Sequence, residues 1–144
     1  MNLDTIQDMW SKDSVIDPDE LHNASLSIPN LHSKYFQLYN DLKLLRAKAK
    51  KIQQSVYHER HLYYSGKAEP DVYVKDPFPI KVREKDALQR YLDADTRLTD
   101  AVLKVEYYDV MLNYLEEIIK TIQNRTFQIK NAIDWQKFIR GYDS

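Results

Sequence analysis

Residues 31–64 carry apolar side chains at alternating steps of four and three residues. The series comprises Leu31, Tyr35, Leu38, Leu42, Leu45, Ala49, Ile52, Val56 and Tyr63, with one interruption at Glu59. Steps of three and four place side chains along one side of an α-helix. The spacing therefore predicts a single helix over residues 31–64, about 50 Å long at the usual rise per residue.

A second apolar series begins at Leu98 and continues to Ile133 with similar spacing. It is wider than a two-helix seam because Met111 and Ile118 lie beside it, and a wide stripe is typical of a helix with more than one neighbour. Only two Gly and five Pro occur in 144 residues, which favours long helices. We predict an all-α fold in which two long helices form an antiparallel hairpin.

The remaining segments predict one or two short N-terminal helices and a Pro-rich connection. Asn2 is a candidate N-cap for the first helix. Asp17-Pro18-Asp19-Glu20 is typical of a second helix start, which Pro29 then ends or kinks. Residues 66–80 hold several Pro and are expected to be extended, with a helix resuming near Lys81.

The long apolar stripes predict self-association. A two-helix hairpin has little interior of its own, so such stripes are better covered when several copies pack together. We expect a homo-oligomer, of coiled-coil type, with the helix over residues 98–133 as its main assembly surface. The residues assigned to that surface are Leu112, Leu115, Ile119, Ile122, Ile129 and Ile133.

Basic and aromatic side chains occupy the other faces of the first long helix. Lys and Arg attract phosphates, and Tyr or His rings stack on unpaired bases without choosing a sequence. The candidate residues for binding single-stranded DNA are Lys43, Arg46, Lys48, Lys50, Lys51, Tyr57, His58, Arg60, His61 and Tyr64. A solvated polar face and a helix lying on a membrane surface are the other interpretations of this strip.

Charge is segregated along the chain although the net charge is only −1. Residues 41–62 hold six Lys or Arg and two acidic residues, whereas residues 91–119 hold two basic and seven acidic residues. Such blocks favour local binding patches or faces that meet between subunits. Lys67, Lys75, Lys81 and Arg83 extend the basic character into the connection.

Catalytic and cofactor motifs are missing from the sequence. The chain has no Cys, and His58 and His61 do not have the spacing of an HExxH zinc helix. No Gly-rich phosphate loop occurs. We expect no enzymatic activity, no catalytic residues, no cofactor and no metal. No apolar run approaches the length that spans a bilayer, so we expect a cytoplasmic protein without a membrane partner.

Residues 57–66, YHERHLYYSG, resemble the UvsY family of recombination mediators of T-even-type bacteriophages. That family carries a basic helical motif that runs into a Tyr-Tyr-Ser-Gly end, here Tyr63 to Gly66. The order and spacing of further matching residues extend the resemblance over nearly the whole chain. These residues are Asp13-Ser14-Val15-Ile16-Asp17, Ala94-Asp95, Val102-Leu103-Lys104-Val105, Arg125, Phe127, Ile129-Lys130, Phe138 and Gly141.

The resemblance implies an all-helical subunit that binds single-stranded DNA and assembles into a ring-like homo-oligomer, heptameric in the family. It implies a mediator that helps a RecA-like phage recombinase load onto strands covered by the phage single-strand-binding protein. This role belongs to homologous recombination, DNA repair and recombination-dependent replication in the host cell cytoplasm. Arg60 falls on a basic position of the family's DNA-binding motif, and His58 on another where Lys is usual.

We therefore expect one helical domain over residues 1–144, in three parts. Residues 1–65 form the DNA-binding part, residues 66–80 the connection, and residues 81–144 the oligomerisation helices. The alternative function is a structural coiled-coil oligomer with no role in binding nucleic acid.

Overall fold

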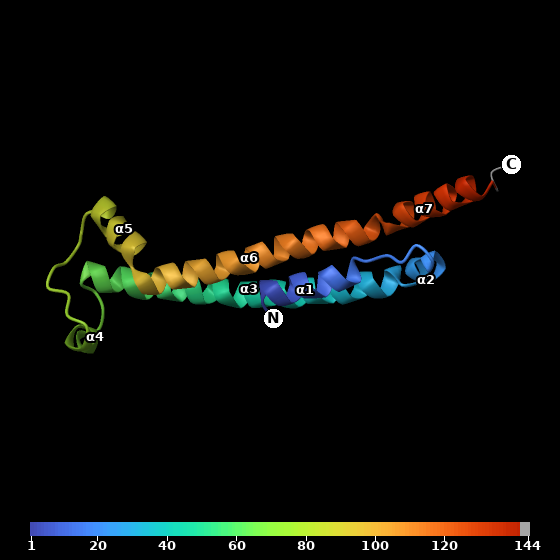
Figure 1. The fold of residues 1–144 in the computed structure, drawn as a ribbon. Helices are drawn as coiled ribbons and strands as arrows, with labels where there is room; N and C mark the ends of the chain where they lie inside the picture. Colours follow the sequence, from blue (N-terminus) through green and yellow to red (C-terminus); the bar gives the residue numbers. More distant parts are fainter. Residues whose placement is uncertain (142–144) are drawn as a thin grey trace. The chain divides into compact units, whose positions relative to one another are not determined.

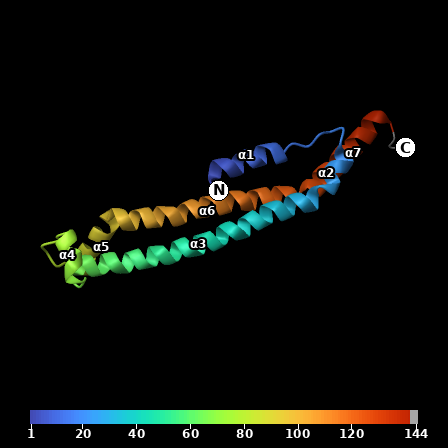
Figure 2. The same ribbon diagram turned by 90° about the horizontal axis from the view of Figure 1, so that it is seen from below.

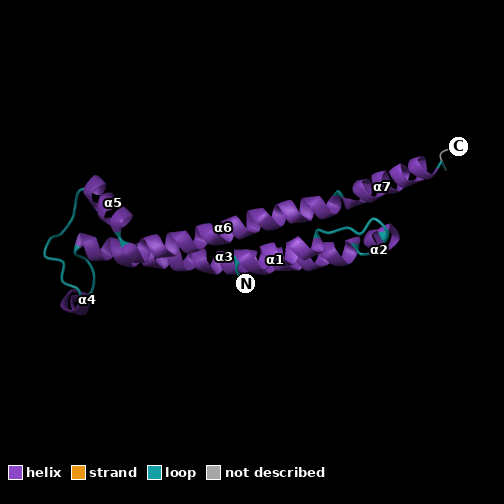
Figure 3. Ribbon diagram, in the orientation of Figure 1, coloured by secondary structure: helices purple, strands orange, loops and turns teal. Residues whose placement is uncertain are grey.

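The computed structural model describes residues 1–141, and every regular element in that range is a helix (Figures 1 and 3). The helices are α1 (Leu3–Asp13), α2 (Leu21–Leu26), α3 (Ile28–Ser65), α4 (Pro70–Lys75), α5 (Lys85–Ala94), α6 (Thr96–Gln123) and α7 (Arg125–Arg140). The all-α fold predicted from the sequence is confirmed. No helix within residues 1–141 is long and apolar enough to cross a membrane.

The N-terminal helices begin at one expected and one unexpected residue. The Asn2 side chain accepts a hydrogen bond from the Thr5 backbone N–H at 2.8 Å and caps α1, as predicted. Asp17 instead accepts from the Asp19 N–H at 2.9 Å within a turn, so α2 begins only at Leu21. The sequence predicted a helix start at Asp17-Pro18-Asp19-Glu20, but Glu20 is the N-cap and the helix begins after this segment.

Pro29 neither ends nor kinks a helix. It is the second residue of α3, which starts at Ile28 rather than at Leu31. The first backbone N–H groups of a helix have no partner within it, so Pro loses no hydrogen bond there. The opposite end lies where the sequence placed it, because α3 ends at Ser65 and Gly66 follows with φ 78°.

The connection and the second long helix differ from the prediction. Residues 70–75 form α4, so the connection is not extended throughout, and the next helix begins at Lys85 rather than near Lys81. The helix expected over residues 98–133 is divided at Asn124 into α6 and α7. Asn124 keeps backbone hydrogen bonds to Lys120 and from Gln128, so the division is a local break rather than a loop.

The chain forms two compact units, to which α3 and α6 both contribute. The first comprises residues 1–42 and the described residues from 110 onward, and the second comprises residues 43–109. In the second unit, ion pairs join Arg46 to Asp109 and Arg60 to Asp95. Residues later in α3 thus contact residues earlier in the sequence around α6, which confirms that the two helices are antiparallel. A single domain over the whole chain stays a prediction.

The first unit is organised around half-buried Asp13 and buried Tyr35. The Tyr35 hydroxyl donates to the Asp13 carboxylate at 2.8 Å, and Lys34 Nζ lies 2.7 Å from the same oxygen. Arg125 donates to the Asp13 backbone carbonyl at 2.6 Å, and Trp10 meets the Tyr35 ring edge-on with centroids 5.5 Å apart. These contacts join α1 to α3 and α7, while α2 packs against α7 (Figure 2).

Most residues assigned to an assembly surface belong instead to the core of the first unit. Leu112, Leu115, Ile122 and Ile129 are buried within the chain, and Ile119 and Ile133 are half-buried. The buried four are not available to a second copy, so their assignment to an interface is corrected. Large apolar side chains are exposed on α7 instead: Phe127, Trp135, Phe138 and Ile139.

Candidate nucleic-acid interface

The outer surface of α3 in the second unit carries a continuous group of basic and aromatic side chains. We call this group the outer strip. Lys50, Tyr57 and His61 follow one another along one side of the helix, since steps of seven and four residues return to nearly the same direction. Lys43 extends this line, and Lys51 and His58 lie beside it. The outer strip comprises Lys43, Lys50, Lys51, Tyr57, His58 and His61.

The outer strip contains no acidic side chain. Glu59 is the one acidic residue of α3 after Asp41. It lies two residues from both Tyr57 and His61, so it is nearly opposite these two residues, but it lines a shallow hollow together with Lys51 and His58. All strip residues are exposed except His61, which is half-buried. The lysines of the strip therefore outnumber the one acidic residue of α3 that lies beside them.

Tyr57 and His61 are aromatic neighbours one helical turn apart. Their ring centroids are 6.1 Å apart with an interplanar angle of 37°. Tyr57 is 43% exposed, so its side chain is accessible to a ligand. An accessible ring with an aromatic neighbour can serve as a platform on which an unpaired base stacks.

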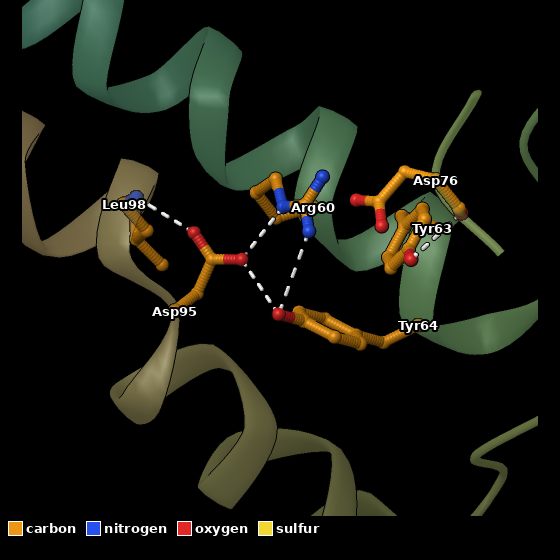
Figure 4. Close-up of polar contacts among 6 residues, drawn as sticks. All are labelled: Arg60, Tyr63, Tyr64, Asp76, Asp95 and Leu98. Atoms are coloured by element: carbon orange, nitrogen blue, oxygen red, sulfur yellow. Dashed lines mark hydrogen bonds and ion pairs between the residues drawn. The ribbon is translucent and has the colours of Figure 1, made fainter. Parts of the chain in front are cut away.

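Arg60, which the sequence placed on this strip, lies inside the fold instead. Its Nε donates to Asp95 Oδ2 at 2.7 Å, and the two side chains are only 8% and 3% exposed (Figure 4). The Tyr64 hydroxyl donates to the same oxygen at 2.6 Å. Asp95 Oδ1 accepts the Leu98 backbone N–H at 2.8 Å and so caps α6. The expectation that Arg60 faces solvent was wrong.

Hydrogen bonds and neighbouring charges keep Asp95 and Arg60 ionised although both side chains are buried. Burial alone would raise the pKa of Asp95, but hydrogen bonds from Tyr64, the Leu98 N–H and Arg60 outweigh it and lower that pKa. Burial and the hydrogen bond to Asp95 raise the pKa of Tyr64, which keeps its proton. Burial would lower the pKa of Arg60, but Tyr64 and Asp95 together raise it. A buried ion pair with satisfied hydrogen bonds is the result.

Tyr64 is also enclosed by rings and is not a free stacking surface. Its ring centroid lies 5.2 Å from that of Phe78 and 5.4 Å from that of Tyr91. The Arg60 guanidinium carbon is 4.2 Å from the centre of the Tyr63 ring, whose hydroxyl donates to the Asp76 carbonyl at 2.9 Å (Figure 4). The interpretation of Tyr64 as a base-stacking residue is therefore corrected.

Two further candidates do not join the outer strip. Arg46 is half-buried and forms an ion pair with Asp109 of α6. Lys48 is exposed and lies beside Lys51, but it faces away from the line of Lys50, Tyr57 and His61, on the side of the helix that carries Glu59. The structure thus brings six of the ten candidates together and separates Arg46, Lys48, Arg60 and Tyr64 from them.

The end of α3 is fixed by backbone contacts. The Lys67 N–H donates to the Leu62 carbonyl at 2.9 Å and the Gly66 N–H to the Tyr63 carbonyl at 3.3 Å, as in a Schellman cap. The Val82 N–H donates to the Tyr64 carbonyl at 3.0 Å and ties the connection to the helix end. Basic residues of the connection are thereby held beside His61.

The sequence of this chain is similar to a known family and to a known phage protein. A family described as "Recombination, repair and ssDNA binding protein UvsY" matches residues 9–142. The recombination protein uvsY of Enterobacteria phage T4 is 27% identical over 143 residues, covering 98% of this chain and 99% of that protein.

Crystal structures of the bacteriophage T4 recombination mediator protein UvsY have the same fold. One lattice form gives a TM-score of 0.85 at 24% identity, covering 97% of this chain and 98% of the other. A second gives 0.82 at 23% identity, covering 93% and 98%. Because the family match spans nearly the whole sequence, this chain belongs to the UvsY family of recombination, repair and single-stranded-DNA-binding proteins.

Proposed function

We propose that this protein is a non-enzymatic recombination mediator that binds single-stranded DNA through the outer strip of α3. The observation that carries the proposal is the separation of two kinds of cation on one helix. Arg46 and Arg60 are paired with carboxylates on the inner side, whereas Lys50 and Lys51 are exposed near Tyr57 and form no ion pair with another residue of 1–141.

The outer strip suits a single strand of any sequence. Its lysines attract phosphates by charge alone, and the Tyr57–His61 pair offers a ring face to a base without reading its edge. Binding is therefore strongly salt-dependent and weakly sequence-dependent, as a mediator that acts on any strand requires.

Mediation follows from holding the strand at many points. Several copies of the outer strip on one oligomer combine their binding energies, because each further contact is made at a high effective concentration. A strand held in this way is gripped less firmly by the phage single-strand-binding protein and is accessible to a RecA-like phage recombinase. The protein acts at this step of recombination, repair and recombination-dependent replication in the host cytoplasm.

Self-association uses α7 in this proposal. Trp135, Phe138 and Ile139 are each more than 60% exposed, and the rings of Trp135 and Phe138 stack with centroids 5.8 Å apart. A patch of this kind on one helix is typical of an interface. A second copy of the chain covers it in a homo-oligomer, with a heptameric ring as the assembly expected for the family.

Fluorescence anisotropy with a labelled oligo(dT) strand and with a duplex of equal length tests the binding. We expect the single strand to bind more tightly, with an affinity that falls steeply between about 50 and 200 mM salt. Addition of the protein is then expected to shorten the lag before the phage recombinase forms filaments on strands precoated with single-strand-binding protein.

A purely structural oligomer is the rival function, and the exposed surface of α7 also suits it. The same titration separates the two. Light scattering that gives an oligomeric mass, together with no affinity for oligo(dT) even at low salt, would favour the structural oligomer over the mediator.

A further inference from the structure

A basic pocket of about 760 Å³ lies where α3 ends and the connection to α5 passes. Lys67, Lys81, Arg83 and Lys85 line it, together with His61 of the outer strip. No acidic side chain is among the lining residues. Its volume is within the range of about 300–1,000 Å³ that small-ligand sites usually have. We call it the basic pocket.

The cations of the basic pocket have no counter-charge within the described chain. Lys67, Lys81, Arg83 and Lys85 are exposed, and none of them forms an ion pair with another residue of 1–141. Glu84 and Asp86 flank Lys85 in sequence but do not line the pocket. Like charges that the backbone holds together repel one another, so an anion bound between them lowers the energy of the site.

The geometry of the pocket is set by the backbone. The Val82 N–H bonds to the Tyr64 carbonyl at 3.0 Å, which fixes the residues on either side of Val82 against α3. The stem of Lys81 lies directly over Gly66: a Cβ at position 66 would be 2.6 Å from Lys81 Cγ. Only Gly, which also accepts the φ of 78°, lets Lys81 cross the helix end so closely.

Stabilisation of the helix dipole does not account for four cations. A helix C-terminus carries only about half a negative charge, located on its last carbonyl groups. Here the Leu62 carbonyl accepts from the Lys67 N–H, the Tyr63 carbonyl from Gly66, and the Tyr64 carbonyl from Val82. With those carbonyls already bonded, the basic pocket retains a large excess of positive charge.

We propose that the basic pocket binds a phosphodiester of the single strand at the end of the outer strip. His61 connects the pocket to the outer strip, since it lines the pocket and its ring is a neighbour of the Tyr57 ring. A strand whose bases stack on Tyr57 and His61 carries its next phosphates toward Lys81 and Arg83. An acidic protein segment would use the same cations but has no need of the adjoining rings. This inference rests on the proposed function and extends its binding site.

The test is a double substitution in the full chain, Lys81→Gln with Arg83→Gln, which replaces two cations by neutral side chains. Gln retains Cγ and Cδ, the atoms of Lys81 that contact Gly66 most closely. Affinity for labelled oligo(dT) is measured against salt. The slope of log affinity against log salt is expected to be shallower by about 1.4, at roughly 0.7 for each cation, with affinity about tenfold weaker near physiological salt.

The matched control removes two exposed cations of α6 that lie outside the pocket, Arg97→Gln with Lys104→Gln. We expect its slope to equal that of the unsubstituted protein. Thermal unfolding midpoints of all three proteins are expected to agree, because every substituted side chain is exposed. If the slope became shallower by the same amount in both variants, the effect would depend only on the net charge of the protein, and the proposal would be overturned.

Other outcomes separate this inference from the proposed function. An unsubstituted protein that does not bind oligo(dT) overturns both. Normal binding with a slope that the pocket variant leaves unchanged overturns the basic pocket alone. Binding of inorganic phosphate that the pocket variant abolishes, together with an unchanged slope and affinity for oligo(dT), would assign the pocket to a free anion and overturn the proposal. Loss of binding to an acidic peptide with unchanged DNA binding would assign it to a protein partner.

Discussion

Arg60 and Asp95 form an ion pair at 2.7 Å that is almost completely withdrawn from solvent. The pair joins α3 to the start of α6, and the second oxygen of Asp95 caps α6 through the Leu98 N–H. One carboxylate thus fixes two elements of the second unit. Arg60 therefore stabilises the fold, unlike the exposed lysines of the outer strip. It affects the outer strip only indirectly, because it fixes the helix that carries the strip.

The first prediction concerns stability. Arg60→Ala leaves Asp95 buried without its charged partner, which is expected to reduce the free energy of unfolding by roughly 3–5 kcal/mol. Lys50→Ala, an exposed position on the same helix, is expected to change it by no more than about 0.5 kcal/mol. Urea unfolding at one fixed protein concentration measures both. Equal midpoints for the two variants would contradict the structural role of Arg60.

The second prediction concerns pH. Because the pKa of Asp95 is lowered in the folded state, its stabilising effect is complete above the unfolded value of about 3.9 and is lost as pH falls through the lower folded value. The difference in unfolding free energy between the unsubstituted protein and Asp95→Asn is therefore expected to be constant from about pH 7 to 5 and to shrink below about pH 4. Asp13 titrates equally in both proteins and cancels. A difference that grows on acidification would refute the assignment.

The third prediction separates the two tyrosines. Tyr57→Ala removes an exposed ring and is expected to weaken binding to oligo(dT) by about 1–3 kcal/mol for each stacked base, with little change in stability. Tyr64→Phe removes a buried hydroxyl that donates to Asp95, so we expect lower stability and unchanged DNA affinity. Anisotropy titrations and thermal unfolding measure the two effects. The reverse pattern would place Tyr64 rather than Tyr57 at the interface.

The fourth prediction concerns assembly. Trp135→Asp with Phe138→Asp places charges on the exposed surface of α7 and is expected to lower the mass measured by light scattering while helix content is retained. Ile122→Asp is the contrasting variant, because Ile122 is completely buried within the chain. A buried unpaired charge is expected to unfold the first unit and lower the helix signal. An unchanged mass for the α7 variant would exclude this surface as the interface.

Much of the fold follows from periodicity alone. The all-α class and the antiparallel pairing follow from apolar side chains at helical spacing, and Gly66 marks the end of α3. The breaks were harder to predict, because α6 and α7 continue one apolar stripe across Asn124. Pro29 was misjudged because its effect depends on whether it stands in the first turn or the interior of a helix.

The candidate site was predicted only in part, because the inner side of α3 is partly polar. Leu45 and Ile52 were expected on the apolar seam but are 41% and 55% exposed. Arg46, Gln53 and Arg60 are more buried than either.

A signal for Arg60 was present, since it lies four residues after Val56 and three before Tyr63, the spacing of the seam itself. Its partner Asp95 lies 35 residues away in sequence, and no local pattern indicates that contact. The basic pocket likewise depends on how the connection folds back onto α3, which spacing along the chain does not determine.

The central claim is that the outer strip, and not Arg60, meets the phosphates of a single strand. The most direct measurement is the salt dependence of oligo(dT) affinity for Lys50→Gln with Lys51→Gln, beside Arg97→Gln with Lys104→Gln as the charge-matched control. We predict a slope shallower by about 1.4 for the strip variant, with an unchanged unfolding midpoint and an unchanged slope for the control. A strip variant whose slope equals that of the unsubstituted protein would contradict the account.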